Sequence, residues 1–248
     1  MPLLTVITPV HAAGSGLLAE TAASVHAARL PAGWSVQWVV QEDGAQPTLR
    51  RTVLDLGGEH DHNRARAGVS ITRNLALARA RGELVFSLDA DDELLSSGLA
   101  TMIDTLTAGA DAPGGGRLEL GWVAGGHVDG SGVPDRHWKP DAARLWHRGE
   151  LLTRGAADLG FHPNNLLVRT GLLWRVGGWP ALPGMEDEVL VLQLNGLAHG
   201  AAVAVPSVHY RRHPGQTVAS AEFLSRLDGY RSWVRRYVAE TVAATEPP

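Results

Sequence analysis

A short apolar segment, Leu84–Leu88, runs directly into three carboxylates, Asp89, Asp91 and Asp92. A continuous apolar run of this length predicts a buried strand. Side chains of an extended chain alternate between two faces, so we expect Asp89 and Asp91 to share one face, with Asp92 on the other. Like charges held this close repel each other, and a hard divalent cation that takes oxygen ligands is the commonest reason for such a pair. The stretch therefore predicts a metal site at the end of a strand.

The same acids have a simpler interpretation as a helix cap. Ser96 or one of the aspartates could accept hydrogen bonds from the first amides of a following helix. A cap needs one oxygen acceptor, whereas this stretch supplies three carboxylates. We therefore favour a metal or ligand site over a cap.

Predicted strands alternate with predicted helices through the first part of the chain. Each strand is an apolar or β-branched run that ends in polar residues, and each helix has apolar residues at helical spacing. Such strand–helix–strand units imply a parallel sheet, in which ligands bind beyond the carboxyl ends of the strands. The strands are expected at 3–10, 35–40 and 84–88, and the helices at 17–28, 47–56, 69–81 and 94–106.

The second half of the chain is expected to follow a flexible break at Gly109–Gly116. Strands are expected at 118–124, 161–169 and 201–205, and helices at 170–176, 189–198 and 219–238. Most tryptophans fill a core, but flat indoles also stack on sugar rings. We expect a substrate to bind between Trp122 and Trp179. Five of the eight tryptophans lie between this break and the last predicted helix: Trp122, Trp138, Trp146, Trp174 and Trp179.

The segment His60–His62 invites a metal interpretation, because two imidazoles stand two residues apart. It falls in a predicted polar loop, 57–68, and no third ligand is near it in the sequence. We therefore expect these side chains to be solvated.

Composition excludes several classes of protein. A net charge of −4 argues against a general nucleic-acid or membrane-surface binder. The absence of cysteine excludes disulfides, thiolate metal sites and a cysteine nucleophile. No signal segment or membrane-spanning run is present, so we expect a soluble, cytoplasmic protein. Of the 22 basic residues only Lys139 is lysine, which is typical of a GC-rich bacterial genome.

Several short motifs occur in a fixed order along the chain. They are Thr8-Pro9-Val10, Glu42-Asp43-Gly44, Gly68 to Asn74 (GVSITRN), Asp89-Ala90-Asp91-Asp92, Gly177-Gly178-Trp179, Glu186-Asp187 and Tyr210-Arg211-Arg212-His213. In this order they resemble the T-P-x-Y, D-D-G, G-x-x-x-A-R-N, D-x-D, G-G-F, E-D and Y-R-x-H motifs of the family 2 inverting glycosyltransferases. The match runs to about Thr217.

This resemblance implies the GT-A fold, a single α/β domain with a mostly parallel, Rossmann-like central sheet. The domain would span 1–217, with a nucleotide-binding half at about 1–108 and an acceptor half at about 117–217, followed by a C-terminal helix and tail at 218–248. The implied reaction is an inverting, metal-dependent hexosyl transfer. Its donor would be a UDP-, GDP- or dTDP-sugar, and its acceptor a hydroxyl of a glycan or small molecule.

The resemblance also assigns roles to residues. Asp89 and Asp91 would hold Mn²⁺ or Mg²⁺, and Asp187 would be the general base, with Glu186 beside it as an orienting or acceptor-contacting group. Charge-assisted contacts to the donor phosphates are expected from Arg73, Arg211 and His213. Further donor contacts are expected from Thr8, Pro9, Val10, Asp43 and Ala90.

The chain departs from the family pattern at some nucleotide-contacting positions. His11 and Ala12 stand where a Tyr-Asn pair is common, Glu42 replaces an aspartate, and Ala45 replaces a serine. The Q-x-x-R-W signature of processive synthases is absent, which argues against a polymer-extruding role.

Two other functions remain open from the sequence. A sugar nucleotidyltransferase usually has a basic, glycine-rich loop after its first strand, whereas His11–Gly16 has no lysine or arginine. A catalytically inactive, nucleotide-sugar-binding partner subunit would not need the intact acidic strand end or Glu186-Asp187.

Overall fold

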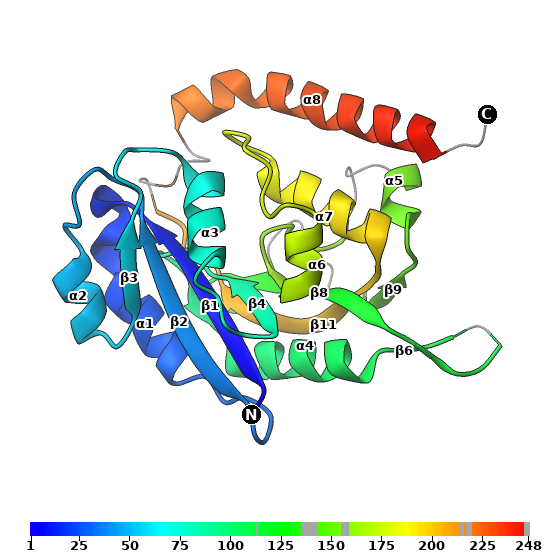
Figure 1. Cartoon of the computed structure of the whole chain (residues 1–248), viewed down its shortest axis with the longest axis horizontal. Helices are drawn as coiled ribbons and strands as arrows, with labels where there is room; N and C mark the ends of the chain where they lie inside the picture. Colours follow the sequence, from blue (N-terminus) through cyan, green and yellow to red (C-terminus); the bar gives the residue numbers. More distant parts are fainter. Residues whose placement is uncertain (113, 135–142, 155–158, 214–215, 217–219, 246–248) are drawn as a thin grey trace.

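The computed structural model describes residues 1–112, 114–134, 143–154, 159–213, 216 and 220–245. Within these residues a nine-stranded sheet has the order β3-β2-β1-β4-β10-β8-β11-β5, with β9 also paired to β11 (Figure 1). Its strands are β1 (Leu3–Val10), β2 (Ser35–Glu42), β3 (Glu59–His62), β4 (Leu84–Ser87), β5 (Glu93–Leu94), β8 (Leu120–Val128), β9 (Arg144–Trp146), β10 (Leu166–Arg169) and β11 (His199–His209).

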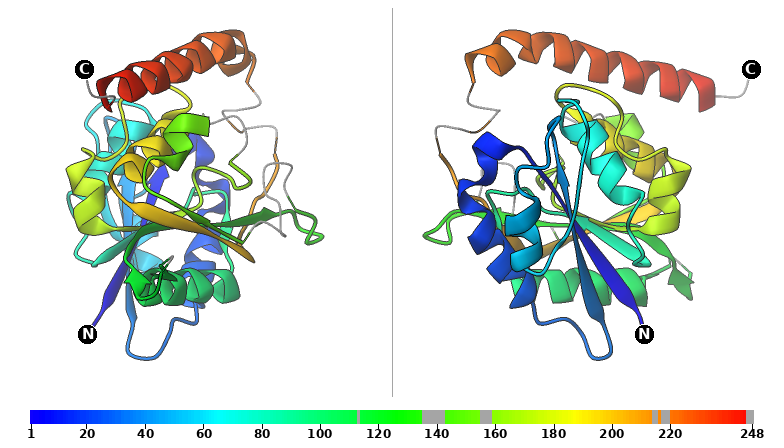
Figure 2. Two further views of the ribbon diagram at one scale, coloured as in Figure 1. Left: turned by 90° about the vertical axis from the view of Figure 1, so that its right-hand side faces the viewer. Right: turned by 60° about the vertical axis from the view of Figure 1, so that its left-hand side comes forward.

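Helices cover both faces of this sheet (Figure 2). They are a 3₁₀ helix η1 (Ala12–Leu17), α1 (Leu18–His26), α2 (Arg50–Asp55), α3 (Val69–Leu77), α4 (Ser96–Ala108), α5 (Glu150–Arg154), α6 (Thr170–Arg175), α7 (Glu186–Leu197) and α8 (Ala221–Thr245). A small hairpin of β6 (Ala110–Asp111) and β7 (Arg117–Leu118) stands apart from the sheet. No described helix is long and apolar enough to cross a membrane.

The first four strands in the order of the sheet are parallel, as the strand–helix alternation predicts. β1 pairs with β2 on one side and with β4 on the other. Their carboxyl ends therefore meet at one edge of the sheet. β10 runs antiparallel to β4, with Leu167 opposite Phe86, so its amino end lies at that same edge. The predicted α/β fold with a mostly parallel central sheet is confirmed.

The apolar strands supply side chains to two cores. Val6 and Phe86 belong to the core under α1 and α4, while Ile7 and Val85 belong to the core under α3, α6 and α7. Neighbouring residues of a strand point to opposite faces, so one apolar run serves both cores. This explains why β1 and β4 read as continuous apolar segments.

Several predicted boundaries were wrong. β2 continues two residues beyond its predicted end, to Glu42, and β4 stops at Ser87. The segment 59–62 is an edge strand parallel to β2, where a loop was expected. The predicted glycine-rich break is largely the β6–β7 hairpin.

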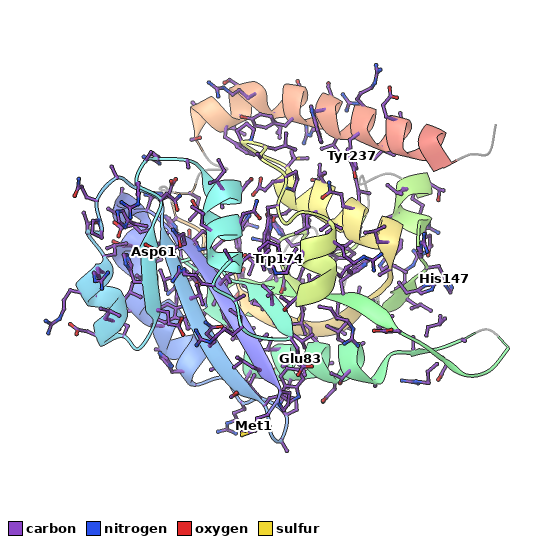
Figure 3. All side chains as sticks on the ribbon, in the orientation of Figure 1. Met1, Asp61, Glu83, His147, Trp174 and Tyr237 are labelled. Carbon is purple, nitrogen blue, oxygen red and sulfur yellow. The ribbon has the colours of Figure 1, made fainter. Side chains whose placement is uncertain are left out.

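The proposed tryptophan walls are also corrected. Trp122 has no exposed surface and packs against Phe161, so it cannot contact an acceptor. Trp146 is buried as well, whereas Trp174 on α6 is 54% exposed (Figure 3). Trp138 lies outside the described residues.

Candidate active site

The acidic segment after β4 forms a turn. The amide of Asp92 donates to the carbonyl of Asp89 over 3.2 Å, and the hydroxyl of Thr21 lies within hydrogen-bond distance of the carbonyls of Ala90 and Asp92. The expectation that Asp92 points away from the other two acids was wrong, because it assumed an extended chain. Each of the three carboxylates offers an oxygen within 4.8 Å of the others.

These three acids differ in their surroundings. Asp92 is 1% exposed and accepts a hydrogen bond from the amide of Arg211 over 3.0 Å. Its burial, and then the charges of Asp89 and Asp91, raise the pKa of Asp92 well above its ordinary value. Hard divalent cations such as Mn²⁺ and Mg²⁺ prefer carboxylate oxygens, so the three acids fit such an ion.

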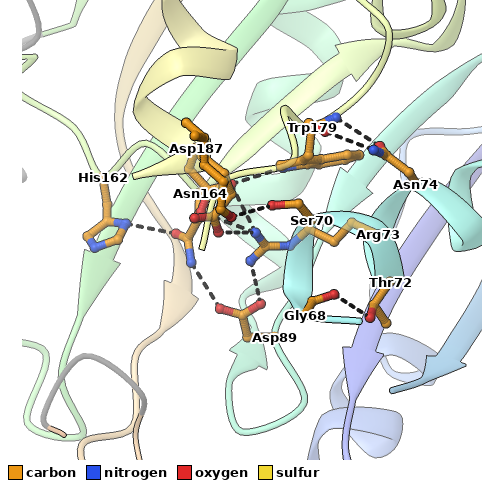
Figure 4. Close-up of polar contacts among 12 residues, drawn as sticks. Gly68, Ser70, Thr72, Arg73, Asn74, Asp89, His162, Asn164, Trp179 and Asp187 are labelled. Carbon is orange, nitrogen blue, oxygen red and sulfur yellow. Dashed lines mark hydrogen bonds and ion pairs between the residues drawn. The ribbon is translucent and has the colours of Figure 1, made fainter. Parts of the chain in front are cut away.

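Arg73, on α3, joins the acidic turn to the start of α7 (Figure 4). One terminal nitrogen donates to Oδ1 of Asp89 over 2.9 Å, and the other donates to Glu186 over 2.8 Å and to Asp187 over 3.1 Å. Burial alone would lower the pKa of Arg73, but the carboxylates of Asp187, Asp89 and Glu186 outweigh it and raise the pKa. This buried cation therefore bonds to three of the protein's own acids, at a position where the resemblance assigns a phosphate contact.

Asp187 lies in the first turn of α7. Its carboxylate accepts hydrogen bonds from Arg73 and from the indole nitrogen of Trp179, the latter over 2.9 Å, and its side chain is 15% exposed. Met185, the residue before α7, has a left-handed backbone (φ 63°), which is unusual for a side chain of this kind. Together these contacts hold one partly exposed carboxylate in a fixed orientation.

Glu186 precedes Asp187 as the first residue of α7. It is buried against Arg73, and burial together with the charge of Asp187 raises the pKa of Glu186 against the opposing effect of Arg73. Glu186 therefore helps to orient Arg73 through their hydrogen bond, and it is less accessible to a substrate than Asp187.

Asn74, next to Arg73 on α3, holds the turn that carries Trp179. Its side-chain amide donates to the carbonyl of Trp179 and accepts from the amide of Trp179, both over 2.8 Å. Gly178 has φ 75°, and a Cβ there would lie 2.2 Å from the Asn74 side-chain oxygen. The Gly177-Gly178-Trp179 motif is thus required by the close approach of this turn to α3.

Two residues of the site were missed by the sequence reasoning. Asn164 donates its side-chain nitrogen to Oδ2 of Asp89 over 3.1 Å, and His162 lies 2.8 Å from the Asn164 side-chain oxygen. Because that oxygen accepts, Nδ1 of His162 must carry the proton. The available signal was the polar run His162 to Asn165 directly before the apolar strand β10.

Residues after β11 close the other side of the acidic turn. Arg211 donates to the carbonyl of Asp91 and to Glu93, and it reaches the carbonyl of Leu17 at 3.3 Å. Arg211 thus holds the acidic turn and the end of η1 together through backbone carbonyls and Glu93. His213 lies with Nε2 2.8 Å from Oδ2 of Asp91, directly beside the predicted metal site.

A pocket of about 510 Å³ opens next to His213. Beside the pocket, the rings of Tyr210 and His127 stack with their centroids 5.4 Å apart. Burial, and then the charges of Asp92, Asp89 and Asp91, raise the pKa of Tyr210 to about 12, so its hydroxyl stays protonated. The pocket is lined by Leu17, Asp129, Gly130, Ser131, His209, Tyr210, Arg211, Arg212 and His213.

The predicted nucleotide contacts of the first strands are mostly buried. Thr8, Pro9, Val10 and Ala90 have little exposed surface, and the Thr8 hydroxyl accepts from the indole of Trp38 over 3.0 Å. The side chains of these residues thus pack inside the protein, next to the carboxyl ends of β1 and β4.

Asp43 is half-buried and holds the loop that leads into α3. Its carboxylate accepts from the amides of Ala67 and Gly68, over 2.6 and 3.1 Å, and from the side chain of Asn63. The contact ties the end of β2 to the start of the helix that carries Arg73.

His60 does not behave as a solvated side chain. It is buried with Nε2 2.9 Å from Glu42, which also accepts from Thr48 and from the amide of Leu49. Burial alone would raise the pKa of Glu42, but the hydrogen bonds from Thr48, Leu49 and His60 outweigh it and lower the pKa. The expectation for His60 was wrong because 59–62 pairs with β2, which brings this ring against Glu42.

Comparison with known proteins gives one family and a set of similar folds. The family model described as "Glycosyl transferase family 2" matches residues 5–177. No curated protein matches the sequence.

Three of the solved structures that share this fold have low sequence identity to this chain. Residues 1–349 of S. aureus TarS, in complex with UDP-GlcNAc, superpose with a TM-score of 0.69 at 18% identity, covering 100% of this chain and 68% of that one. The mannosyltransferase PcManGT from Pyrobaculum calidifontis, in complex with GDP-Man and Mn²⁺, gives a TM-score of 0.55 at 22% identity, covering 82% of this chain and 54% of that one. In the longer TarS structure (TM-score 0.61, 19% identity) the match covers 86% of this chain and only 37% of TarS.

Proposed function

This chain belongs to glycosyl transferase family 2, and from that membership we propose that it transfers a sugar from a nucleotide-diphosphate donor to a hydroxyl of an acceptor. The observation that carries the proposal is the bridge made by Arg73. A single buried guanidinium contacts Asp89 of the acidic turn and Asp187 of α7. The same side chain therefore holds a candidate metal ligand and a candidate base close together. A displacement that uses both groups needs them at one site.

The donor is expected to bind with its diphosphate at the acidic turn. Asp89, Asp91 and Asp92 would hold Mn²⁺ or Mg²⁺, and such an ion, when bound, neutralises the charge that develops on a departing diphosphate. The TarS structure with UDP-GlcNAc and the PcManGT structure with GDP-Man and Mn²⁺ support a nucleotide-sugar donor and a divalent cation. His213, beside Asp91, is placed to contact the same phosphates or the ion.

Asp187 would act as the general base. The acceptor hydroxyl gives its proton to the Asp187 carboxylate while its oxygen forms a bond to the anomeric carbon. The bond from that carbon to the diphosphate oxygen breaks, and the diphosphate leaves with the electron pair. One in-line displacement inverts the anomeric centre, so a single base is sufficient. Trp179 and Arg73 hold this carboxylate in its orientation, and both donate to its charged form.

The acceptor is expected to be a glycan or a small molecule. Its hydroxyl must reach Asp187, because the base takes the proton directly. The buried Trp122 is excluded from this contact.

Calorimetric titration of UDP, GDP and dTDP with and without Mn²⁺ tests the proposal. At least one nucleotide should bind tightly only when the metal is present, and Asp91→Asn should weaken that binding. Asp104→Asn, on the exposed face of α4, is the matched control and should bind as the wild type does. Absence of metal-dependent binding for all three nucleotides would contradict the proposal.

A further inference from the structure

The segment just before the proposed base is covered by the C-terminal helix. α8 lies across α7 and α5 (Figures 1 and 2). Val234 of α8 is buried in the core that α7 also enters, and Tyr237, on the face of α8 turned toward α7, packs against it (Figure 3). α8 is therefore part of the structure around the site.

The rings of two α8 residues pack against Gly184, three residues before Asp187. A Cβ built at Gly184 would lie 2.8 Å from the ring of Phe223 and 2.8 Å from the ring of Tyr230, both on α8. The backbone of Gly184 is not in the left-handed region, so the nearest obstacles to an alanine there are these two rings. Phe223 and Tyr230 also contact each other, with ring centroids 5.7 Å apart.

The other side of the same segment is held by α3. The hydroxyl of Ser70, three residues before Arg73 on α3, donates to the carbonyl of Leu182 over 3.0 Å. The chain from Leu182 to Met185 thus lies between α3 and α8. Met185 then takes its left-handed conformation and α7 begins at Glu186.

We propose that α8 sets the position of the Asp187 carboxylate, with Phe223 and Tyr230 as positioning residues that act through the backbone of Gly184 and Met185. The segment 182–185 is gripped from both sides, and Asp187 follows within one helical turn. A displacement of α8 therefore moves the base relative to Arg73 and Trp179, whose positions depend on α3. The inference rests on the proposed function only in calling Asp187 the base.

A bump-and-hole experiment tests this coupling. Gly184→Ala adds a methyl group against the two rings, and the triple variant Gly184→Ala/Phe223→Leu/Tyr230→Leu provides the space for it. The reporter is the indole ¹H–¹⁵N cross-peak of Trp179, assigned by its loss in Trp179→Phe, because this indole donates to Asp187. Gly184→Ala should shift the cross-peak, and the triple variant should return it toward the wild-type position. Gly229→Ala, on α8 with open space around it, is the matched control and should leave the cross-peak unchanged.

Turnover gives a second measurement, with UDP-GlcNAc hydrolysis as the probe. A base displaced by about 1 Å is expected to cost roughly 10²-fold in rate, so Gly184→Ala should lose activity and the triple variant should regain it. The cross-peak reports the α8 coupling even if the wild type hydrolyses no UDP-GlcNAc, so failure of the proposed function is distinguishable from failure of this inference.

Two results would overturn the inference. One is an unshifted Trp179 cross-peak in Gly184→Ala, and the other is a shift that the triple variant does not reverse, because the effect would then come from the backbone of residue 184 itself. If Gly184→Ala does not fold, Phe223→Leu/Tyr230→Leu decides the question. It should shift the cross-peak and speed hydrogen exchange of the amides at 184–187, and an unchanged spectrum would contradict the proposal.

Discussion

Asn164 donates its side-chain amide to Oδ2 of Asp89 over 3.1 Å, from just before a strand that runs antiparallel to the one that Asp89 follows. The other oxygen of the same carboxylate accepts from Arg73. Two neighbours from opposite sides thus fix the rotation of one acidic side chain. Groups that orient a metal ligand in this way typically change metal affinity by about 10–100-fold.

Asn164→Ala should therefore weaken Mn²⁺ binding by about 10–100-fold, because it frees the Asp89 carboxylate to rotate. Titration of Mn²⁺ followed by electron paramagnetic resonance measures this without any substrate. His162→Gln keeps a donor to Asn164 and should have a smaller effect. Equal affinity of Asn164→Ala and wild type would show that the hydrogen bond does not orient the ligand.

Arg73→Met should be strongly destabilising, because it leaves Asp89, Glu186 and Asp187 facing one another without their shared cation. Removing one partner of a buried ion pair costs about 3–5 kcal/mol. Urea denaturation of the variant and the wild type measures the difference in free energy of unfolding. Arg51→Met breaks an exposed pair with Asp55 and should cost about 0–1 kcal/mol. A loss as small as that of Arg51→Met would contradict the shared-cation account.

Asp187→Asn should lower turnover by roughly 10²–10⁴-fold while nucleotide binding stays normal. If Asp187 acted only at the amino end of α7, the same change would cost about 0.3–1 kcal/mol of stability and little activity. Steady-state kinetics and calorimetry on the folded variant separate the two roles. The stereochemistry of the product is an independent measurement, because an α-linked donor must yield a β-linked product if the displacement is single and in line.

Glu188 predicts a pH dependence of stability. It lies on α7, and burial raises its pKa from 4.5 to about 7 against the opposing charge of Arg231 on α8. Because the pKa of Glu188 is higher in the folded state, the folded state binds this proton more tightly than the unfolded state. The resulting stabilisation is fully present below about pH 4.5 and is lost as the pH rises through about 7. Glu188→Gln should flatten the fall in melting temperature over that range. A wild-type profile that the substitution leaves unaltered would place the cause elsewhere.

The sequence predicted the parts of the fold that depend on local pattern. The strands β1 and β4 were predicted from their own apolar runs, without knowledge of their neighbours. The carboxylates could be predicted as a candidate site because three like charges follow a buried strand. All of these signals lie within a few residues of one another.

The missed features depend on contacts between distant segments. Periodicity identifies a strand at β10 but not its neighbours or direction, so the meeting of Asn164 with Asp89 could not be foreseen. The alternation rule failed at Asp92 because the strand had already ended at Ser87. Nothing local to α3 shows that Glu186 and Asp187, more than a hundred residues away, would contact Arg73.

The bridge made by Arg73 has a consequence for how substitutions combine. Asp89 and Asp187 belong to different halves of the chain, yet both bond to the same guanidinium. Once one acid is neutralised, the cation shifts toward those that remain, so the second substitution acts on an already altered partner. The effects of Asp89→Asn and Asp187→Asn should therefore be non-additive in a double-mutant cycle, as is usual for residues within one ion-pair network. A substitution at either acid therefore changes what a later substitution at the other acid does.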